Sequence, residues 1–401
     1  MSLAQLIRGI EPAIRRRWLR WYVGATVGLE RRPPATWREA VRRIVYVRYD
    51  RVGDMIIATP LLRALATAFP AATIDVVASP WNAAILRDNP FVRRTYVYER
   101  KKRRAQWSLM RQLGRARYDV AIDGLIPWRR FVPTATVKLI AATRAPVRIG
   151  TGGRENDEVF SVVLPPLRDG AHYTEHLSDI ATALGLDPAA IDWRPELHLT
   201  AAERRDAEER WRALPGSGGR LFVNISATDA ARRWRDERYV EALRHLRELR
   251  PELKIGVTGS PADDERVRRI AQTTGTSAML IPGLFDTFAA LEAADCVFTP
   301  DTAISHAAAA FAKPVVVMHL ANGTWFPPYG APGRSLFGGP GDDSLDAITV
   351  DAVLAALEEA LSGRAPLVRP GPRRVAERPR AAASVAEASP AGGPAAAGGR
   401  P

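Results

Sequence analysis

Two carboxylates, Asp50 and Asp54, follow the first β-branched run of the chain and lie one helical turn apart, on either side of Gly53. The run predicts a strand over 44–48, and the apolar segment from Met55 predicts a helix directly after it. In an open α/β sheet the carboxyl end of a strand faces the ligand crevice, and a carboxylate at the next helix start is favoured by the helix dipole. Asp54 is therefore either a helix cap or a base aimed into a cleft. Its position, taken alone, favours the interpretation as a cap.

A second group of polar residues follows a later run, 296–299. Asp301 and Thr302 come directly after it, and His306 lies in a helix of small residues. Small side chains at a helix start let a ligand approach the backbone amides, and free amides with the helix dipole form an anion site suited to a diphosphate. Taken alone, an Asp-Thr pair is more often a cap.

Two further loops carry charged residues at strand ends. Arg232 follows the run 221–226, and Asp263 and Asp264 follow a glycine turn after 254–258. Basic residues over the crevice would neutralise phosphate, and a carboxylate beyond the turn could bind ribose hydroxyls.

These side chains need a parallel sheet to bring them to one edge, and the chain supplies the pattern for it. After residue 43, short β-branched runs alternate with amphipathic helical stretches, which indicates βαβ units. Strands are predicted at 44–48, 74–78, 92–98, 118–123, 147–149, 221–226, 254–258, 296–299 and 315–319, and helices at 236–249, 261–273, 287–294, 302–312 and 351–361. We expect an α/β chain with two doubly wound, Rossmann-like domains, 44–190 and 191–362.

The net charge of +13 lies at the two ends of the chain. The arm 1–43 holds ten Arg and three Glu, and the segment from residue 364 holds seven Arg and two Glu. The body between them is close to neutral, so a nucleic-acid surface built into the fold is disfavoured. The tail 363–401 is rich in Ala, Pro, Gly and Arg, and we expect it to be disordered.

Cysteine and hydropathy indicate the compartment. The single cysteine, Cys296, excludes an internal disulfide framework and a cysteine-built zinc site, which suits a reducing cytoplasm. No apolar stretch reaches the roughly 20 residues of a membrane helix, and the Arg-rich start lacks the apolar block of a signal peptide. We therefore expect a cytoplasmic protein.

Five motifs follow one another along residues 44–362. They are Gly53-Asp54 with Thr59-Pro60-Leu61-Leu62-Arg63-Ala64-Leu65, Arg232-Arg233-Trp234, Gly259-Ser260-Pro261, Asp301-Thr302-Ala303-Ile304-Ser305-His306-Ala307-Ala308-Ala309, and Lys313-Pro314-Val315-Val316-Val317 with Pro328-Tyr329-Gly330. In this order and spacing they resemble glycosyltransferase family 9, the bacterial ADP-heptose:lipopolysaccharide heptosyltransferases. The resemblance implies a GT-B fold, with two Rossmann-like domains across a cleft, and inverting, metal-independent sugar transfer to a lipid-linked glycan.

The resemblance also implies roles for single residues. Asp54 falls on the family's proposed general base. The implied donor site comprises Arg232, Asp263 or Asp264, Asp301, Thr302, Ala303 and His306. Arg232 stands where the family usually has Lys, Ala303 where it has Gly, and Asp50 where it commonly has Ser. The segment 319–322 also differs from the family pattern.

The implied reaction needs a base and a stabiliser of the departing nucleoside diphosphate. Asp54 would take the first role, and Arg232 with the amides at 301–303 the second. The chain holds no Asp-x-Asp tripeptide and no three-glycine dinucleotide fingerprint, so we expect neither a metal nor a bound cofactor besides the nucleotide sugar. His172 and His176 have a zinc-like spacing, but a packed helix is the favoured interpretation.

Two other interpretations stay open. The altered residues Ala303 and 319–322 support a nucleotide-binding or scaffold protein that has kept the fold and lost catalysis, and the retained Asp54 argues against it. A family member that uses another nucleotide sugar is the second.

A basic run follows the third predicted strand. Its members include Arg100, Lys101, Lys102 and Arg103. It is either a solvated loop or a clamp for an anionic acceptor, because Arg and Lys bind the carboxylates and phosphates of inner-core lipopolysaccharide.

The arm contains one amphipathic stretch, 12–22. Its apolar stripe is Ile14, Trp18, Trp21 and Tyr22, and arginines lie outside the stripe or at its edge. Such a helix either docks on the cytoplasmic face of the inner membrane or packs on the protein's own first domain.

Overall fold

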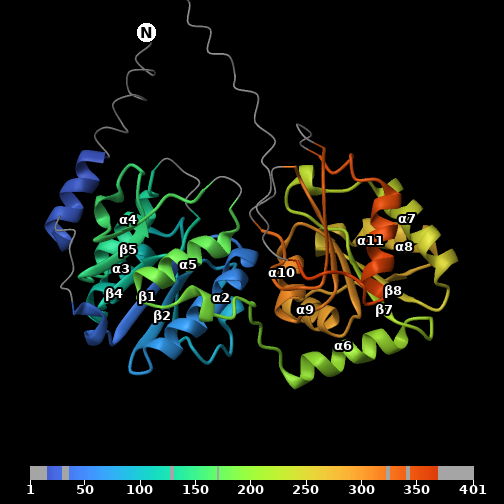
Figure 1. The fold of residues 1–401 in the computed structure, drawn as a ribbon, viewed down its shortest axis with the longest axis horizontal. Coiled ribbons are helices and arrows are strands. Elements are labelled where there is room, and N and C mark those ends of the chain that lie inside the picture. The colour runs from blue at the N-terminus through green and yellow to red at the C-terminus, as the bar shows by residue number, and fades with distance from the viewer. Residues whose placement is uncertain are drawn as a thin grey trace, which may run out of the picture. The chain divides into compact units, whose positions relative to one another are not determined.

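The computed structural model describes residues 16–28, 36–126, 131–168, 171–321, 326–339 and 344–368. Within these ranges the chain forms two six-stranded parallel sheets with flanking helices (Figure 1). Both sheets belong to one compact unit. Most of the predicted tail 363–401 lies outside the described residues.

The first sheet has the strand order β3-β2-β1-β4-β5-β6. Its strands are β1 (Arg43–Arg48), β2 (Thr73–Ala78), β3 (Arg94–Val97), β4 (Val120–Asp123), β5 (Val147–Thr151) and β6 (Val162–Leu164), and its helices are α2 (Val52–Ala68), α3 (Arg103–Ala116), α4 (Thr134–Ala142) and α5 (Tyr173–Ala183). Alternate residues of β1 enter two cores. Ile44 and Tyr46 pack with α2 and α5, whereas Val45 and Val47 pack with α3 and α4. Parallel strands buried on both faces in this way need a continuous apolar run.

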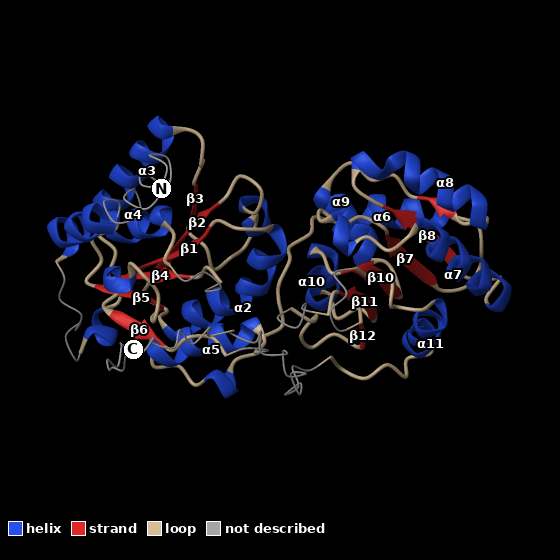
Figure 2. Ribbon diagram, turned by 90° about the horizontal axis from the view of Figure 1, so that it is seen from above, coloured by secondary structure: helices blue, strands red, loops and turns tan. Residues whose placement is uncertain are grey.

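The second sheet has the order β12-β11-β10-β7-β8-β9. Its strands are β7 (Arg220–Asn224), β8 (Lys254–Thr258), β9 (Ser277–Ala278), β10 (Cys296–Pro300), β11 (Val315–His319) and β12 (Gly333–Phe337), and its helices are α6 (Ala201–Ala213), α7 (Asp236–Leu249), α8 (Asp264–Thr274), α9 (Leu284–Glu292), α10 (Ala303–Ala310) and α11 (Val350–Leu361). Helices α7, α8 and α11 cover one face, and α6, α9 and α10 cover the other. Figure 2 shows the strands lying between the helices in each sheet.

The nine predicted strands are all present, with ends displaced by a few residues at most. Three strands were not predicted, namely β6, β9 and β12. Short 3₁₀ turns lie at η1 (Trp37–Ala40), η2 (Ala83–Leu86), η3 (Asp157–Val159), η4 (Pro188–Ala190), η5 (Ala230–Arg232) and η6 (Pro261–Asp263).

Residues 184–200 surround the predicted boundary between the two domains and form neither an α-helix nor a strand before α6 begins. The Thr200 hydroxyl accepts a hydrogen bond from the Glu203 amide at 3.2 Å and so fixes the start of α6. Arg63 of α2 pairs with Glu196, which fastens the junction to the first domain.

An additional helix spans 16–27. Among the described residues, neither this helix nor any other is long and apolar enough to cross a membrane.

Candidate active site

Asp54 lies in the first turn of α2, directly after β1. Its Oδ2 accepts a hydrogen bond from the Arg51 backbone amide at 3.2 Å, so the carboxylate caps the helix. Its Oδ1 lies 3.5 Å from Nη2 of Arg48. The side chain keeps 15% of its surface exposed, so capping the helix does not close it off from a substrate.

Arg48 is the last residue of β1 and is fully buried. Its Nε lies 3.2 Å from Oδ1 of Asp50, and its Cζ lies 4.4 Å from the centre of the Tyr173 ring. A buried guanidinium is tolerated only where partners compensate the loss of hydration. Here Nη1 donates to the Gly124 carbonyl and the Tyr173 hydroxyl, and the guanidinium also lies beside the carboxyl groups of Asp50 and Asp54.

Asp50 has an unusual acidity. The pKa of its carboxyl is raised to about 7, chiefly by burial and in smaller part by the charge of Asp54, although Arg48 acts in the opposite direction. Asp50 therefore holds a proton over much of the acidic range, while Asp54 shares the same cation. Two carboxyl groups at one cation with different environments can divide acid and base roles.

Helices α2 and α10 pack closely at this point. A Cβ atom added to Gly53 would lie 2.8 Å from Cδ2 of His306, so only glycine permits this approach. Burial lowers the pKa of His306 to about 4, so the imidazole is neutral at pH 7. Gly53 thus brings the Asp54 turn of the first domain to the start of α10 in the second.

The start of α10 has the features of an anion site. Thr302 is its N-cap, and its hydroxyl accepts a hydrogen bond from the Ile304 amide at 3.3 Å. Ala303, which is half-buried, is the first helical residue. The cap interpretation of the Asp-Thr pair is therefore correct for Thr302.

Asp301 is the centre of a buried charge cluster. Its Oδ2 lies 3.0 Å from Nη1 of Arg232 and 3.8 Å from Nδ1 of His319. Although burial opposes ionisation, these two neighbours hold the pKa of Asp301 below its usual value. The carboxylate is thus kept ionised and orients Arg232 at the end of β10.

Asp263 is the last residue of η6, beyond the glycine turn that follows β8, as predicted. Its Oδ2 accepts hydrogen bonds from the hydroxyls of Ser226, at 2.5 Å, and Ser260, at 2.6 Å. Although burial opposes ionisation, these bonds hold the pKa of Asp263 below its usual value. Asp264 is instead the first residue of α8. Of the two predicted ribose-binding carboxylates, Asp263 is therefore the one that the hydroxyls of Ser226 and Ser260 orient.

The basic run lies on the surface. Arg100, Lys101, Lys102 and Arg103 are exposed, and Arg103 begins α3. Lys102 pairs with Glu99 at 2.6 Å. The run follows β3, and parallel strands place their carboxyl ends at the same edge of the sheet as the Asp54 turn.

The histidine pair predicted at 172 and 176 is divided between two environments. His172 is the N-cap of α5, and its Nε2 lies 3.0 Å from the Pro327 carbonyl, whereas His176 is buried inside the helix. Among the described residues, no three His, Cys, Asp or Glu side chains are grouped to hold a metal ion. Cys296 is buried, and burial raises the pKa of its thiol to about 12.

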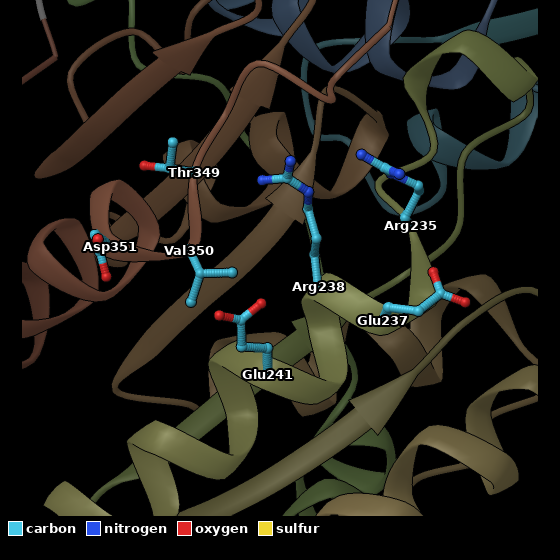
Figure 3. A pocket seen from close by; sticks show the side chains of 7 residues that line it. All are labelled: Arg235, Glu237, Arg238, Glu241, Thr349, Val350 and Asp351. Carbon is cyan, nitrogen blue, oxygen red and sulfur yellow. The ribbon is translucent and has the colours of Figure 1, made fainter.

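A hollow of about 430 Å³ on the second domain is lined by other residues (Figure 3). Arg235, Arg238 and Asp351 are among its lining residues. Arg235 pairs with Asp346, and Arg238 donates to the Ile348 carbonyl. These arginines fasten α7 to the segment before α11, which is a structural role.

Several residues of this site were not predicted from the sequence. They are Arg48, Asn224, Ser226, Ser260 and His319. One signal was present for Arg48, because a charged residue at the end of a buried apolar strand must have a partner. The others become visible only when neighbouring strands are known, as when Asn224 of β7 donates to Thr299 of β10 at 2.9 Å.

Comparison with known proteins agrees with this architecture. The profile of glycosyltransferase family 9 (heptosyltransferase) matches residues 106–330. The chain is similar to the structure of a family 9 glycosyl transferase from Veillonella parvula DSM 2008, with 20% identity, a TM-score of 0.69, and coverage of 80% of this chain and 97% of that one.

Two heptosyltransferases of E. coli are also similar in structure. The ADP-heptose lipopolysaccharide heptosyltransferase II is 23% identical, with a TM-score of 0.62 and coverage of 80% and 99%. The heptosyltransferase WaaC, whose structure contains ADP, is 20% identical, with a TM-score of 0.59 and coverage of 80% and 99%. These similarities show the GT-B fold. The search of curated proteins returned no match to the chain.

Proposed function

The chain belongs to glycosyltransferase family 9 and is a glycosyltransferase, and from this premise we propose an inverting, metal-independent transfer of a sugar to a lipopolysaccharide core or a related cell-surface glycan. ADP-heptose is the proposed donor, because a structurally similar E. coli enzyme is named for it. Another nucleotide sugar is the alternative within the family. The proposed acceptor is anionic and lipid-linked, so the enzyme would work in the cytoplasm at the inner membrane.

The observation that carries the proposal is the pair of carboxyl groups on the buried Arg48. In an inverting transfer, a base removes the proton of the acceptor hydroxyl as its oxygen attacks the anomeric carbon. Asp54 is the proposed base, since its carboxylate is partly exposed and Arg48 lies 3.5 Å away. Asp50, with a pKa raised to about 7 chiefly by burial, is proposed to bind the acceptor as a hydrogen-bond donor while protonated.

The departing nucleoside diphosphate needs positive potential as the glycosidic bond breaks. We assign this role to Arg232, which Asp301 holds at 3.0 Å, and to the backbone amides of Thr302 and Ala303 at the start of α10, because the Asp301 amide already donates to the Met318 carbonyl and the Ile304 amide to the Thr302 hydroxyl. His306 is neutral and lies near the Asp54 turn, where it would donate or accept a hydrogen bond. In this scheme no step requires a metal or any cofactor besides the nucleotide sugar.

An exposed indole at the same edge supports a sugar acceptor. Trp81 is 77% exposed and lies in the loop after β2. This loop is fastened to the end of β1, because Ser79 donates to the Asp50 carbonyl at 3.1 Å and Asn82 donates to the Arg48 carbonyl at 3.2 Å. We propose that Trp81 offers its ring face to the acceptor sugar, and that Arg100 and Lys101 bind its charged groups.

The decisive experiment compares Asp54→Asn with wild type and with Asp346→Asn, which removes the carboxylate that pairs with Arg235. Turnover is measured with ADP-heptose and a truncated lipopolysaccharide acceptor, with and without a chelator, and ADP affinity by calorimetry. Asp54→Asn is expected to keep ADP affinity and lose about 10²-fold or more in turnover, as for removal of a general base. Asp346→Asn is expected to behave as wild type.

The alternative functions predict different outcomes of the same experiment. Near-normal turnover in Asp54→Asn, or full dependence of wild type on Mg²⁺ or Mn²⁺, would overturn the mechanism. A wild-type protein that binds ADP but transfers no sugar would support the scaffold interpretation. Transfer from a different nucleotide sugar would change the donor and leave the role of Asp54 in place.

A further inference from the structure

The helix 16–27 rests on the first domain through a face different from its predicted aromatic stripe. Leu19 and Val23 are 1% and 2% exposed and join the core beneath α3 and α4. Trp18 and Trp21 are 43% and 66% exposed. Tyr22 is half-buried, and Ile14 lies outside the described residues. The helix therefore packs on its own domain and still presents two indoles to solvent.

A second helix on the same face of the sheet has the same composition. In α3, Leu109 and Leu113 enter the same core, and Trp107 on the opposite side of the helix is 59% exposed. The Arg111 guanidinium lies 4.5 Å from the centre of the Trp107 ring. Figure 1 shows the dark blue helix 16–27 beside α4, in the layer that also contains α3.

The two outward faces point in one direction. Helices that cover one face of a sheet form a single layer, so residues opposite their buried sides lie on its outer surface. Trp21 stands opposite Leu19 on the first helix, as Trp107 stands opposite Leu109 on α3, because two residues correspond to about 200° of helical rotation. The outer surface of this layer therefore carries both rings.

Acidic residues are missing from this layer. The segment 16–27 holds three Arg and no Asp or Glu, and the segment 100–118 holds eight Lys and Arg and again no acidic residue. Among the described residues, no acidic side chain pairs with Arg17, Arg104 or Arg111. Exposed cations that lie close together without acidic partners repel one another, and an anionic surface bound to them would offset this repulsion.

We propose that these two helices form a docking surface for an anionic lipid bilayer. Its members are Arg17, Trp18, Arg20, Trp21, Arg104, Trp107 and Arg111, and we call it the arm–α3 surface. Indole rings settle at the level of the lipid headgroups, and arginines beside them meet anionic phosphates, so a bilayer uses both components of the surface. A duplex nucleic acid would use the arginines and leave the outward indoles in water.

This inference deepens the proposed function, because a lipid-linked acceptor is reached at a membrane, but it does not depend on catalysis. The bilayer contact involves the layer of α3, whereas the proposed reaction uses the carboxyl edge of the sheet. Failure of the two proposals is therefore distinguishable, since vesicle binding and ADP affinity are measured separately.

The test is co-sedimentation of the full-length protein with vesicles of phosphatidylcholine, alone or with phosphatidylglycerol. One variant combines Trp21→Ser with Trp107→Ser, and another combines Arg17→Gln, Arg104→Gln and Arg111→Gln. The matched controls are Leu249→Ser, which removes an apolar side chain that is 61% exposed at the end of α7, and Arg205→Gln with Arg212→Gln and Arg268→Gln, which removes exposed charges from the second domain.

Wild type and both controls are expected to bind the anionic vesicles and not the neutral ones. Each arm–α3 variant is expected to bind the anionic vesicles at least about tenfold more weakly than wild type. Its ADP affinity is expected to be unchanged. Brominated lipid should quench wild-type tryptophan fluorescence and should quench the Trp21 and Trp107 variant less. No binding by wild type, or equal binding by all variants, would overturn the proposal. Vesicle binding that duplex DNA abolishes and that the tryptophan variant retains would assign the surface to nucleic acid instead.

Discussion

Nη2 of Arg48 lies 3.5 Å from Oδ1 of Asp54, and the arginine side chain that makes this contact is fully buried. The same guanidinium contacts Asp50 at 3.2 Å. Bringing a guanidinium into the interior costs several kcal/mol, which its partners must offset. A cation fixed between two carboxyl groups therefore lies beside the proposed base, and it opposes the rise that burial causes in the pKa of Asp50.

The first prediction concerns this cation. Arg48→Met removes the charge that favours ionised carboxylates, so the protonated forms of the pair gain at a given pH. Turnover at pH 7 is expected to fall by about tenfold or more, and the acidic limb of the pH profile of kcat/KM is expected to move to higher pH. Arg48→Lys, which keeps a positive charge, is expected to lie between wild type and Arg48→Met.

A merely structural role of Arg48 has a different signature. It would reduce turnover by the same factor at every pH, in proportion to the fraction of protein that is folded. Thermal unfolding of both variants measures that fraction. A pH profile of Arg48→Met that coincides with that of wild type after this correction would reject control of the pair by Arg48.

The second prediction concerns the donor site. Arg232→Ala is expected to weaken nucleoside diphosphate binding by about 1.5–3 kcal/mol, the range for a charge-assisted hydrogen bond. Arg235→Ala is the matched control, because Arg235 also pairs with an aspartate but does so at the remote hollow. Calorimetry with ADP measures both. Equal affinities for the two variants and wild type would show that Arg232 serves only Asp301.

Sequence patterns predicted the interior of each sheet well and its edges poorly. The nine predicted strands carry β-branched or apolar runs, whereas the three that were missed, β6, β9 and β12, are all edge strands. An edge strand pairs on one side and is half-covered, so it needs no continuous apolar run. The strand β9 has only two residues, Ser277 and Ala278, which leaves no periodicity to detect.

The candidate site was predictable where it depends on single strand ends. Asp50, Asp54 and Asp301 each follow a strand, so the sheet places them at its carboxyl edge. The pairing of Arg232 with Asp301 and the packing of His306 against Gly53 depend on which elements are neighbours. Local sequence patterns do not predict which elements are neighbours, because the order of strands and the approach of α10 to α2 are set by tertiary packing.

The third prediction concerns the basic loop. Neutralising Arg100, Lys101, Lys102 and Arg103 to Gln is expected to raise the KM for a soluble, anionic acceptor about tenfold and to leave ADP affinity unchanged. The single variant Lys102→Gln is expected to change KM little, because Glu99 already pairs with Lys102 at 2.6 Å. Neutralising Arg115 and Arg117 near the far end of α3 is the control. A fourfold variant with both constants of wild type would make the loop solvated surface.

The last prediction concerns stability in acid. Burial lowers the pKa of His172 to about 4, of His176 to about 3 and of His306 to about 4, from 6.5. Between pH 6.5 and about 4 the unfolded chain therefore binds up to three more protons at these sites, and stability falls as pH falls. Asp50 acts oppositely, since its raised pKa of about 7 makes the folded state hold a proton that the unfolded chain releases above 3.8. Burial also raises the pKa of Asp123 and of Asp179, so three carboxyl groups oppose the three histidines, and the contribution of each histidine is read from its own variant.

The substitution His176→Gln removes one of the three histidines that bind a proton in the unfolded chain. The free energy of unfolding in urea, measured at several pH values between 6.5 and 4.5, is expected to decline less steeply by about 1 kcal/mol per pH unit. Asp50→Asn is expected to steepen the decline, because it removes the opposing proton. His245→Gln, which alters an exposed imidazole, serves as the control. A uniform drop for His176→Gln at all pH values, with an unchanged slope, would mean that His176 contributes packing and no proton linkage.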